Sequence, residues 1–347
     1  FPYTTLFRSW SMKKNWLTWI ISLLILAALA WFFRDQLDFI SEGLRRLRHA
    51  KPFPVVLVVF FALLSIAGMA EVMKRLIGAG GVKVPLCETY AITLASNAWS
   101  TTLPAGPAFS AVLTFQVQRR WDASVALCSY FLFLSSIVSS MFLALIGLGG
   151  VFFLNADMAL GSLITTVVLM LAALGGIFWL TSHPVTLEGW LRKLRPGPKR
   201  DRAIQEVRNL GEVHLSRGPF AVVAGASLVH RLADMAALWA SVWAVTGEIP
   251  WLRAGADDTT LAGVALAFLA AKLAGSAQVT PGGLGTVEAA LITPLVATGL
   301  TVVHATSAAI IYRLISFALI TIIGWVIYFA HYARDGFSYA ALNRKES

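Results

Sequence analysis

Long stretches with few charged residues dominate the hydropathy pattern of the chain and predict helices that cross a membrane. An α-helix needs about 17 or more consecutive apolar residues to span the hydrocarbon core of a bilayer. A cleaved signal peptide is an alternative for the first stretch, because Ala28, Leu29 and Ala30 resemble a cleavage site. We expect full spans at 15–33, 53–70, 123–148, 158–181, 218–246 and 302–329.

Two further apolar segments are interrupted by proline and glycine. Residues 84–118 are broken near 100–107, and residues 259–300 are broken near 280–285. A proline inside a helix frees backbone polar groups, which must find other partners when lipid surrounds them. We therefore expect a re-entrant helical hairpin at each segment. Ordinary kinks, or loops at the membrane surface, are the alternative interpretation.

Composition points to a membrane protein and excludes an ordinary soluble enzyme. Of the 347 residues, 57% are hydrophobic and only 13% are charged, whereas soluble domains carry roughly 25% charged residues. The net charge is +10, but the basic residues stand in short blocks beside the apolar stretches. This placement is typical of loops at a membrane surface, so nucleic-acid binding is not expected.

Loop charges divide the chain into two membrane halves. Residues 183–217 carry eight Lys or Arg against four acids, which predicts a cytoplasmic loop. The N-terminal half is expected at 12–182 and the C-terminal half at 218–335, with a cytoplasmic tail at 336–347. Residues 1–11 precede Met12 and are interpreted as a non-native leader. Both ends of the chain are then cytoplasmic.

This arrangement makes the two hairpins open toward opposite sides of the membrane, which is the layout of an inverted repeat. The predicted fold is an all-α polytopic membrane protein with about six spans and two opposed broken hairpins. The basic residues between Arg34 and Lys51 contradict the charge rule. Residues 36–50 place their leucines at helical spacing and their arginines off that stripe, so a helix lying in the interface is expected there.

Candidate substrate-binding residues gather at the two interruptions. Unwound backbone in the membrane offers N–H and C=O groups to a polar substrate, and glycine lets a turn approach a ligand closely. Glu288 and Arg313 stand alone in apolar stretches, where each charge costs roughly 2.5–3.5 kcal/mol, so we expect them to pair or to meet a head group. The candidate set is Thr102, Pro104, Gly106, Thr280, Pro281, Gly282, Gly283, Gly285, Glu288, Tyr312 and Arg313.

Arg231 and Asp234 lie three residues apart in one predicted span, so an ion pair between them is expected. Such a pair could have a structural or a functional role, and the sequence favours neither of the two. The six histidines have no metal-ligand spacing, and no Gly-x-Ser-x-Gly motif is present. We therefore expect no catalytic residues, no metal and no cofactor.

The second interruption also carries a family resemblance. Residues 280–291, followed by 312–316, resemble the second-half signature of the lysylphosphatidylglycerol synthase transmembrane family, which includes the flippase domain of multiple-peptide-resistance proteins. Residues 103–107 and 119–120 agree in the first half, and the resemblance covers about 12–335. It implies a bacterial membrane protein acting on lipids. The best-known members move aminoacylated phosphatidylglycerol between leaflets.

The chain departs from the family pattern in its first half. Ala105 stands where many members have glycine, Phe109 takes the place of an acid, and Ser129 and Tyr130 occupy the region of a Glu-Arg pair. We also expect the soluble acyltransferase-like domain of those members to be missing here. A lysyltransferase activity would then need a partner protein that supplies that domain.

These features favour a lipid translocase of the cell membrane that handles an anionic or aminoacylated phospholipid head group. Two alternatives stay open. One is a small-solute or ion-coupled transporter on the same scaffold. The other is the membrane subunit of a phosphatidylglycerol lysyltransferase.

Overall fold

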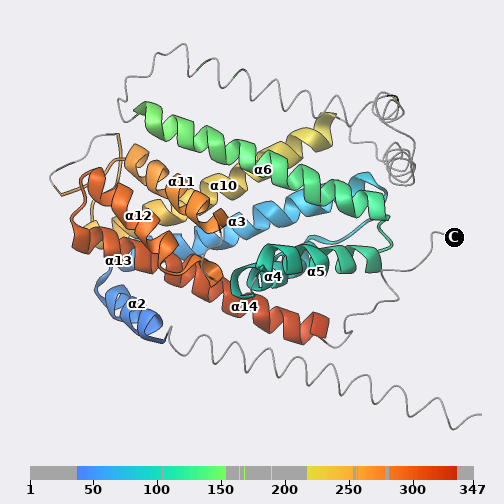
Figure 1. Cartoon of the computed structure of the whole chain (residues 1–347), viewed down its shortest axis with the longest axis horizontal. Coiled ribbons are helices and arrows are strands. Elements are labelled where there is room, and N and C mark those ends of the chain that lie inside the picture. The colour runs from blue at the N-terminus through green and yellow to red at the C-terminus, as the bar shows by residue number, and fades with distance from the viewer. Residues whose placement is uncertain are drawn as a thin grey trace, which may run out of the picture.

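A computed structural model describes residues 37–103, 105–153, 164, 168, 189, 217–252, 255, 257–277 and 281–333. Within these residues every regular element is helical and no strand occurs (Figure 1). The α-helices are α2 (Leu37–His49), α3 (Pro52–Ala79), α4 (Leu86–Thr102), α5 (Gly106–Arg120), α6 (Val125–Phe153), α10 (Arg217–Thr246), α11 (Leu261–Ala277), α12 (Thr286–Ala297), α13 (Val302–Arg313) and α14 (Ile320–Ile327). The short helices are η2 (Pro281–Gly283), η3 (Leu314–Leu319) and η4 (Tyr328–Tyr332).

Four helical stretches among the described residues are long and apolar enough to cross a membrane. They are Pro52–Ala79, Val125–Gly150, Gly218–Thr246 and Val302–Tyr332, and they confirm four of the predicted spans. The predicted spans 15–33 and 158–181 fall outside the described residues, apart from the helical residues Ile164 and Val168.

The last of these stretches is one composite helix. α13 continues into η3, α14 and η4, and both η3 and η4 are π-helical. The first π-helical turn begins directly after Arg313. Wider π turns re-aim the side chains around them and are frequent at functional sites. The irregularity therefore falls beside a residue of the candidate set.

α3 and α10 pack along one another in opposite directions. The start of α3 lies at the end of α10, where the Lys51 N–H donates to the Ala244 carbonyl at 2.9 Å. Farther along α3, the backbone of Gly68 lies against Ala226 and His230 of α10. The helices α4, α6, α11 and α13 pack against this central pair of long spans (Figure 1).

The first predicted hairpin is observed as α4 and α5, which pack side by side around a break at 103–105. Gly106 makes this close packing possible, because a Cβ there would lie 2.1 Å from the Ser100 carbonyl oxygen. Ala105 adopts a left-handed φ of 54° at the turn. The left-handed backbone of Ala105 and the close packing at Gly106 therefore produce the bend, at the position that the two prolines predict.

The second predicted hairpin is observed as α11 and α12, with η2 in the break. The Thr259 and Thr298 hydroxyls lie 2.7 Å apart and join the two helices at the open end. A tight turn after Thr298 leads directly into α13.

The two hairpins open at opposite ends of the last composite helix. α12 precedes the first residues of α13, whereas Glu88 at the start of α4 contacts His331 in η4, with 3.3 Å between Oε2 and Nε2. The tips meet, because a Cβ on Gly282 would lie 2.9 Å from the Thr101 carbonyl oxygen. In Figure 1 the hairpins lie on opposite sides of the view and approach each other near its centre.

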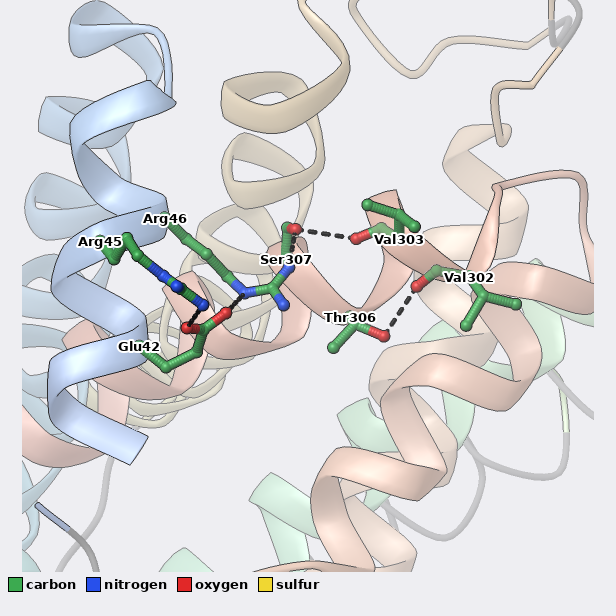
Figure 2. A network of polar contacts seen from close by, with 7 residues as sticks. All are labelled: Glu42, Arg45, Arg46, Val302, Val303, Thr306 and Ser307. Carbon is green, nitrogen blue, oxygen red and sulfur yellow. Dashed lines mark hydrogen bonds and ion pairs between the residues drawn. The ribbon is translucent and has the colours of Figure 1, made fainter. Parts of the chain in front are cut away.

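The amphipathic segment expected at 36–50 is the helix α2, and it is attached to α13 by a polar network (Figure 2). Glu42 forms ion pairs with Arg45 and Arg46. Arg46 also donates a hydrogen bond to the Ser307 hydroxyl, which in turn donates to the Val303 carbonyl at 2.8 Å. The network docks α2 against the first turns of the helix that carries Arg313.

Candidate functional site

A cavity of about 460 Å³ lies where the two hairpin tips meet α3, α10 and α13. Its volume is within the range of small-molecule sites, roughly 300–1,000 Å³. Much of the lining is polar or charged although the surrounding helices are apolar. The polar, charged and glycine lining residues are Ser65, Asn97, Ser100, Thr101, His230, Arg231, Asp234, Lys272, Gly275, Gly282, Gly283, Tyr312, Arg313 and Ser316.

Arg313 joins three parts of the C-terminal half. Its Nε donates to Oε1 of Glu288 at 2.7 Å, and its Nη2 donates to the Gly282 carbonyl at 2.8 Å. Its guanidinium also lies over the Phe317 ring, 4.1 Å from the centroid. Charge-assisted hydrogen bonds of this length are roughly twice as strong as neutral ones. The expected Glu288–Arg313 pair is confirmed.

Glu288 uses its second carboxylate oxygen within its own helix. Oε2 accepts the Gly285 N–H at 2.6 Å, which caps the N-terminus of α12. An acid in the first turn is further stabilised by the helix dipole. Both oxygens of Glu288 are therefore engaged, and the residue ties the broken loop to Arg313.

A second network surrounds Asp234 of α10, which is buried. Its Oδ2 lies 2.5 Å from Nζ of Lys272 in α11, and its Oδ1 accepts the Tyr312 hydroxyl at 2.8 Å. Asp234 thus connects the long span α10 to the second hairpin and to the last composite helix.

The ion pair expected between Arg231 and Asp234 is not formed among the described residues. Arg231 instead donates from Nε to the Ser139 carbonyl of α6 at 3.2 Å, while Asp234 pairs with Lys272. Residues three apart share one face of a helix, but neighbouring helices offer both side chains other partners. Lys272 is the main residue that sequence reasoning missed, and its isolation in a long apolar stretch was the available signal.

The glycine turn is shaped by contacts as well as by left-handed backbone. Gly282 and Gly283 have φ of +63° and +65°, a region that residues with a Cβ rarely adopt. A Cβ on Gly282 would lie 2.8 Å from the Phe317 ring, and one on Gly283 would lie 2.5 Å from Cγ2 of Val287. Both glycines line the cavity, so backbone approaches it where side chains have no room.

The described candidate residues of the first hairpin do not line the cavity, although two neighbouring residues do. Thr102 is buried and its hydroxyl donates to the Ala98 carbonyl at 2.7 Å, whereas Thr101 and Ser100 line the cavity. Gly106 packs on Ser100 and serves the turn. Pro104 lies outside the described residues.

In the second hairpin, Pro281 opens η2, and Gly285 precedes α12. Thr280 falls outside the described residues. His230, which is not in the candidate set, lines the cavity, with Nδ1 2.9 Å from the Ser65 hydroxyl.

The charges around the cavity favour an anionic ligand group. Arg231, Lys272 and Arg313 line it together with the Asp234 carboxylate. Asp234 pairs with Lys272 and Glu288 pairs with Arg313, which leaves the positive charge of Arg231 in excess. No group of three or more metal-ligating side chains occurs in the described part of the chain.

Long apolar helices, two broken hairpins and a charged internal cavity define a polytopic helical membrane protein. Residues 19–324 match the family model described as the lysylphosphatidylglycerol synthase TM region. The chain therefore belongs to this family, and the resemblance found at 280–291 and 312–316 is confirmed. The family relates the chain to phospholipid handling in a membrane. No curated protein matches the chain.

Proposed function

We propose that this protein translocates a phospholipid with a polar head group across the membrane. The observation that carries the proposal is the cavity at the meeting point of the two hairpin tips, lined by Arg231, Lys272 and Arg313. The head group occupies the cavity while the acyl chains remain in lipid.

The arrangement of charges supports a phosphate-bearing head group. A charge within the bilayer core costs roughly 2.5–3.5 kcal/mol, so charged residues retained there need a partner or a function. Arg313 has Glu288 as its partner, and Lys272 has Asp234. No carboxylate of the described residues lies within ion-pair distance of Arg231, whose Nε bonds a neutral carbonyl. We infer that Arg231 binds the phosphate.

An aminoacylated or zwitterionic head group would use the Asp234 network in addition. The ammonium group of such a lipid replaces Lys272 at the Asp234 carboxylate, and the Tyr312 hydroxyl holds that carboxylate in place. An exchange of one cation for another leaves the buried charge balanced throughout, which keeps its electrostatic cost low.

We further infer that the hairpins belong to two inverted repeats, since they open at opposite ends of the last composite helix. Alternating access then arises from rocking of one half against the other around the shared cavity. In this arrangement the basic loop 183–217 and both chain ends are cytoplasmic, and the protein lies in the cell membrane of a bacterium.

Reconstitution into liposomes tests the proposal. Fluorescent phosphatidylglycerol and lysylphosphatidylglycerol in the inner leaflet become accessible to an impermeant quencher only after they are moved. We expect translocation by the native chain and a loss of at least tenfold in Arg231→Gln, corresponding to about 1.4 kcal/mol. Arg48→Gln, which removes an exposed arginine of α2 that does not line the cavity, is the matched control.

Equal translocation by Arg231→Gln and the native chain would refute the role of Arg231. Movement of no lipid by any variant, together with uptake of a small solute, would replace the translocase with a solute transporter. Aminoacyl transfer by the purified chain alone would favour the enzyme alternative.

A further inference from the structure

A second cavity of about 650 Å³ lies at the end of α3, away from the hairpin tips. It shares no lining residue with the central cavity. Ser65 of α3 lines the central cavity, and Lys74 lies nine residues beyond it. Nine residues correspond to about 13 Å along an α-helix. The lining consists of Lys74, Arg75, Gly78, Ala79, Val82, Lys83, Val84, Pro85 and Pro219.

This basic pocket carries uncompensated positive charge. The Arg75 Nε bonds the Glu71 carboxylate at 2.6 Å. Lys74 and Lys83 make no hydrogen bond or ion pair with any of the described residues, and the Lys83 side chain is exposed. Two ammonium groups therefore face the same pocket, and no carboxylate in the described part of the chain pairs with either of them.

The position of the basic pocket is that of lipid head groups. Ala79 is the last residue of the span Pro52–Ala79, and Pro219 is the second residue of the span Gly218–Thr246. The pocket is therefore located where two antiparallel spans end, between the apolar core and water. Basic pockets between transmembrane helices at this depth suit phosphate-bearing lipids.

The walls of the pocket also fit a lipid rather than a small soluble anion. Val82, Val84, Pro85 and Pro219 line it beside the lysines. Apolar walls can cover a glycerol backbone and the first methylene groups of an acyl chain, while an ammonium group binds the phosphate. A soluble phosphate would leave those walls uncovered.

We propose that the basic pocket binds one anionic phospholipid, with its phosphate between Lys74 and Lys83. The inference does not rest on the translocase function, because it uses neither the central cavity nor the tips of the hairpins. It assigns the end of α3 a lipid site separate from the central one.

Photo-crosslinking of the full-length protein in phosphatidylcholine nanodiscs tests the proposal. The probes are phosphatidylglycerol and phosphatidylcholine with the same photoreactive group near the glycerol, and mass spectrometry assigns the labelled peptide. We expect phosphatidylglycerol to label 74–85 preferentially. Each basic residue near a membrane surface contributes about 1 kcal/mol, so the double variant Lys74→Gln/Lys83→Gln should lower this labelling about thirtyfold.

Two further variants separate the site from simple surface charge. Lys74→Arg/Lys83→Arg keeps both charges and should retain the labelling. A Cβ on Gly78 meets nothing within 4 Å, so Gly78→Phe adds bulk to the pocket lining from open space and should abolish labelling while leaving the charges in place. A single symmetric peak in size-exclusion chromatography and an unchanged helical circular dichroism spectrum report that each variant is folded.

Three results would overturn the proposal. The first is equal labelling of 74–85 by both lipids, and the second is unchanged labelling in Gly78→Phe. The third is competition by glycerol phosphate that lowers the labelling at the same concentration as unlabelled phosphatidylglycerol does. The last result would assign the pocket to a soluble phosphate ester.

Discussion

The ion pair between Asp234 and Lys272 makes a quantitative prediction about stability. Removal of one partner of a buried ion pair costs about 3–5 kcal/mol, because a charge is left without compensation. The two side chains differ in exposure, at 12% for Asp234 and 29% for Lys272. The cost should therefore depend on which partner is removed.

Lys272→Met leaves the more buried charge behind. The Asp234 carboxylate then keeps only the Tyr312 hydroxyl, and we expect a loss of about 3 kcal/mol in the free energy of unfolding. Asp234→Asn leaves an ammonium group that can reach water in the cavity, so about 1–2 kcal/mol is expected. The double variant should cost about as much as Asp234→Asn alone, because no buried charge is left unpaired.

Unfolding of the purified protein in mixed micelles measures these differences as a double-mutant cycle. The matched control is the exposed pair of Arg75 and Glu71, with 46% and 23% exposure, where Arg75→Met should cost less than about 1 kcal/mol. A larger loss in Asp234→Asn than in Lys272→Met, or additive single costs, would refute the reasoning.

Three further predictions concern the glycine turn, Arg313 and the attachment of α2. Gly283→Leu should abolish lipid translocation while membrane insertion stays normal, because φ of Gly283 is +65° and Val287 occupies the space of a side chain. Normal translocation by this variant would show that 280–285 is only a loop. Arg313→Ala should reduce translocation more than Arg119→Ala, since Arg313 holds Glu288 and Gly282 together; the reverse order in the liposome assay would remove Arg313 from the site. Arg46→Ala should release α2 from Ser307 and increase the cleavage of α2 in limited proteolysis, because the lost hydrogen bond contributes about 0.5–1.5 kcal/mol to its docking. An unchanged cleavage pattern would mean that the packing of Gly43 on Leu314 is enough to hold α2 in place.

Much of the architecture could be predicted because membranes restrict the solutions available to a chain. Long stretches with few charged residues located the four observed spans, and paired proline and glycine located both breaks within a few residues. The Glu288 position, three residues after Gly285, is that of a capping carboxylate. These signals are local, so they are visible in a sequence.

The partners across helices could not be predicted in the same way. Arg231 and Asp234 share a helix, yet α6 and α11 provide the groups that each one contacts. Thr101 faces the cavity and Thr102 does not, because adjacent residues point about 100° apart and the rotation of α4 is set by tertiary packing. Such facts depend on how the helices pack together.

Reversible locking of the hairpin tip tests the central claim most directly. The Thr101 and Thr321 hydroxyls lie 3.0 Å apart, so Thr101→Cys/Thr321→Cys brings two thiols together at this contact. The pair is built in a Cys87→Ser/Cys128→Ala background. We predict that oxidation fixes the first hairpin to the last composite helix and stops lipid translocation in liposomes, and that reduction restores it. Full translocation with the disulfide quantitatively formed would contradict a function that depends on the meeting of the two tips.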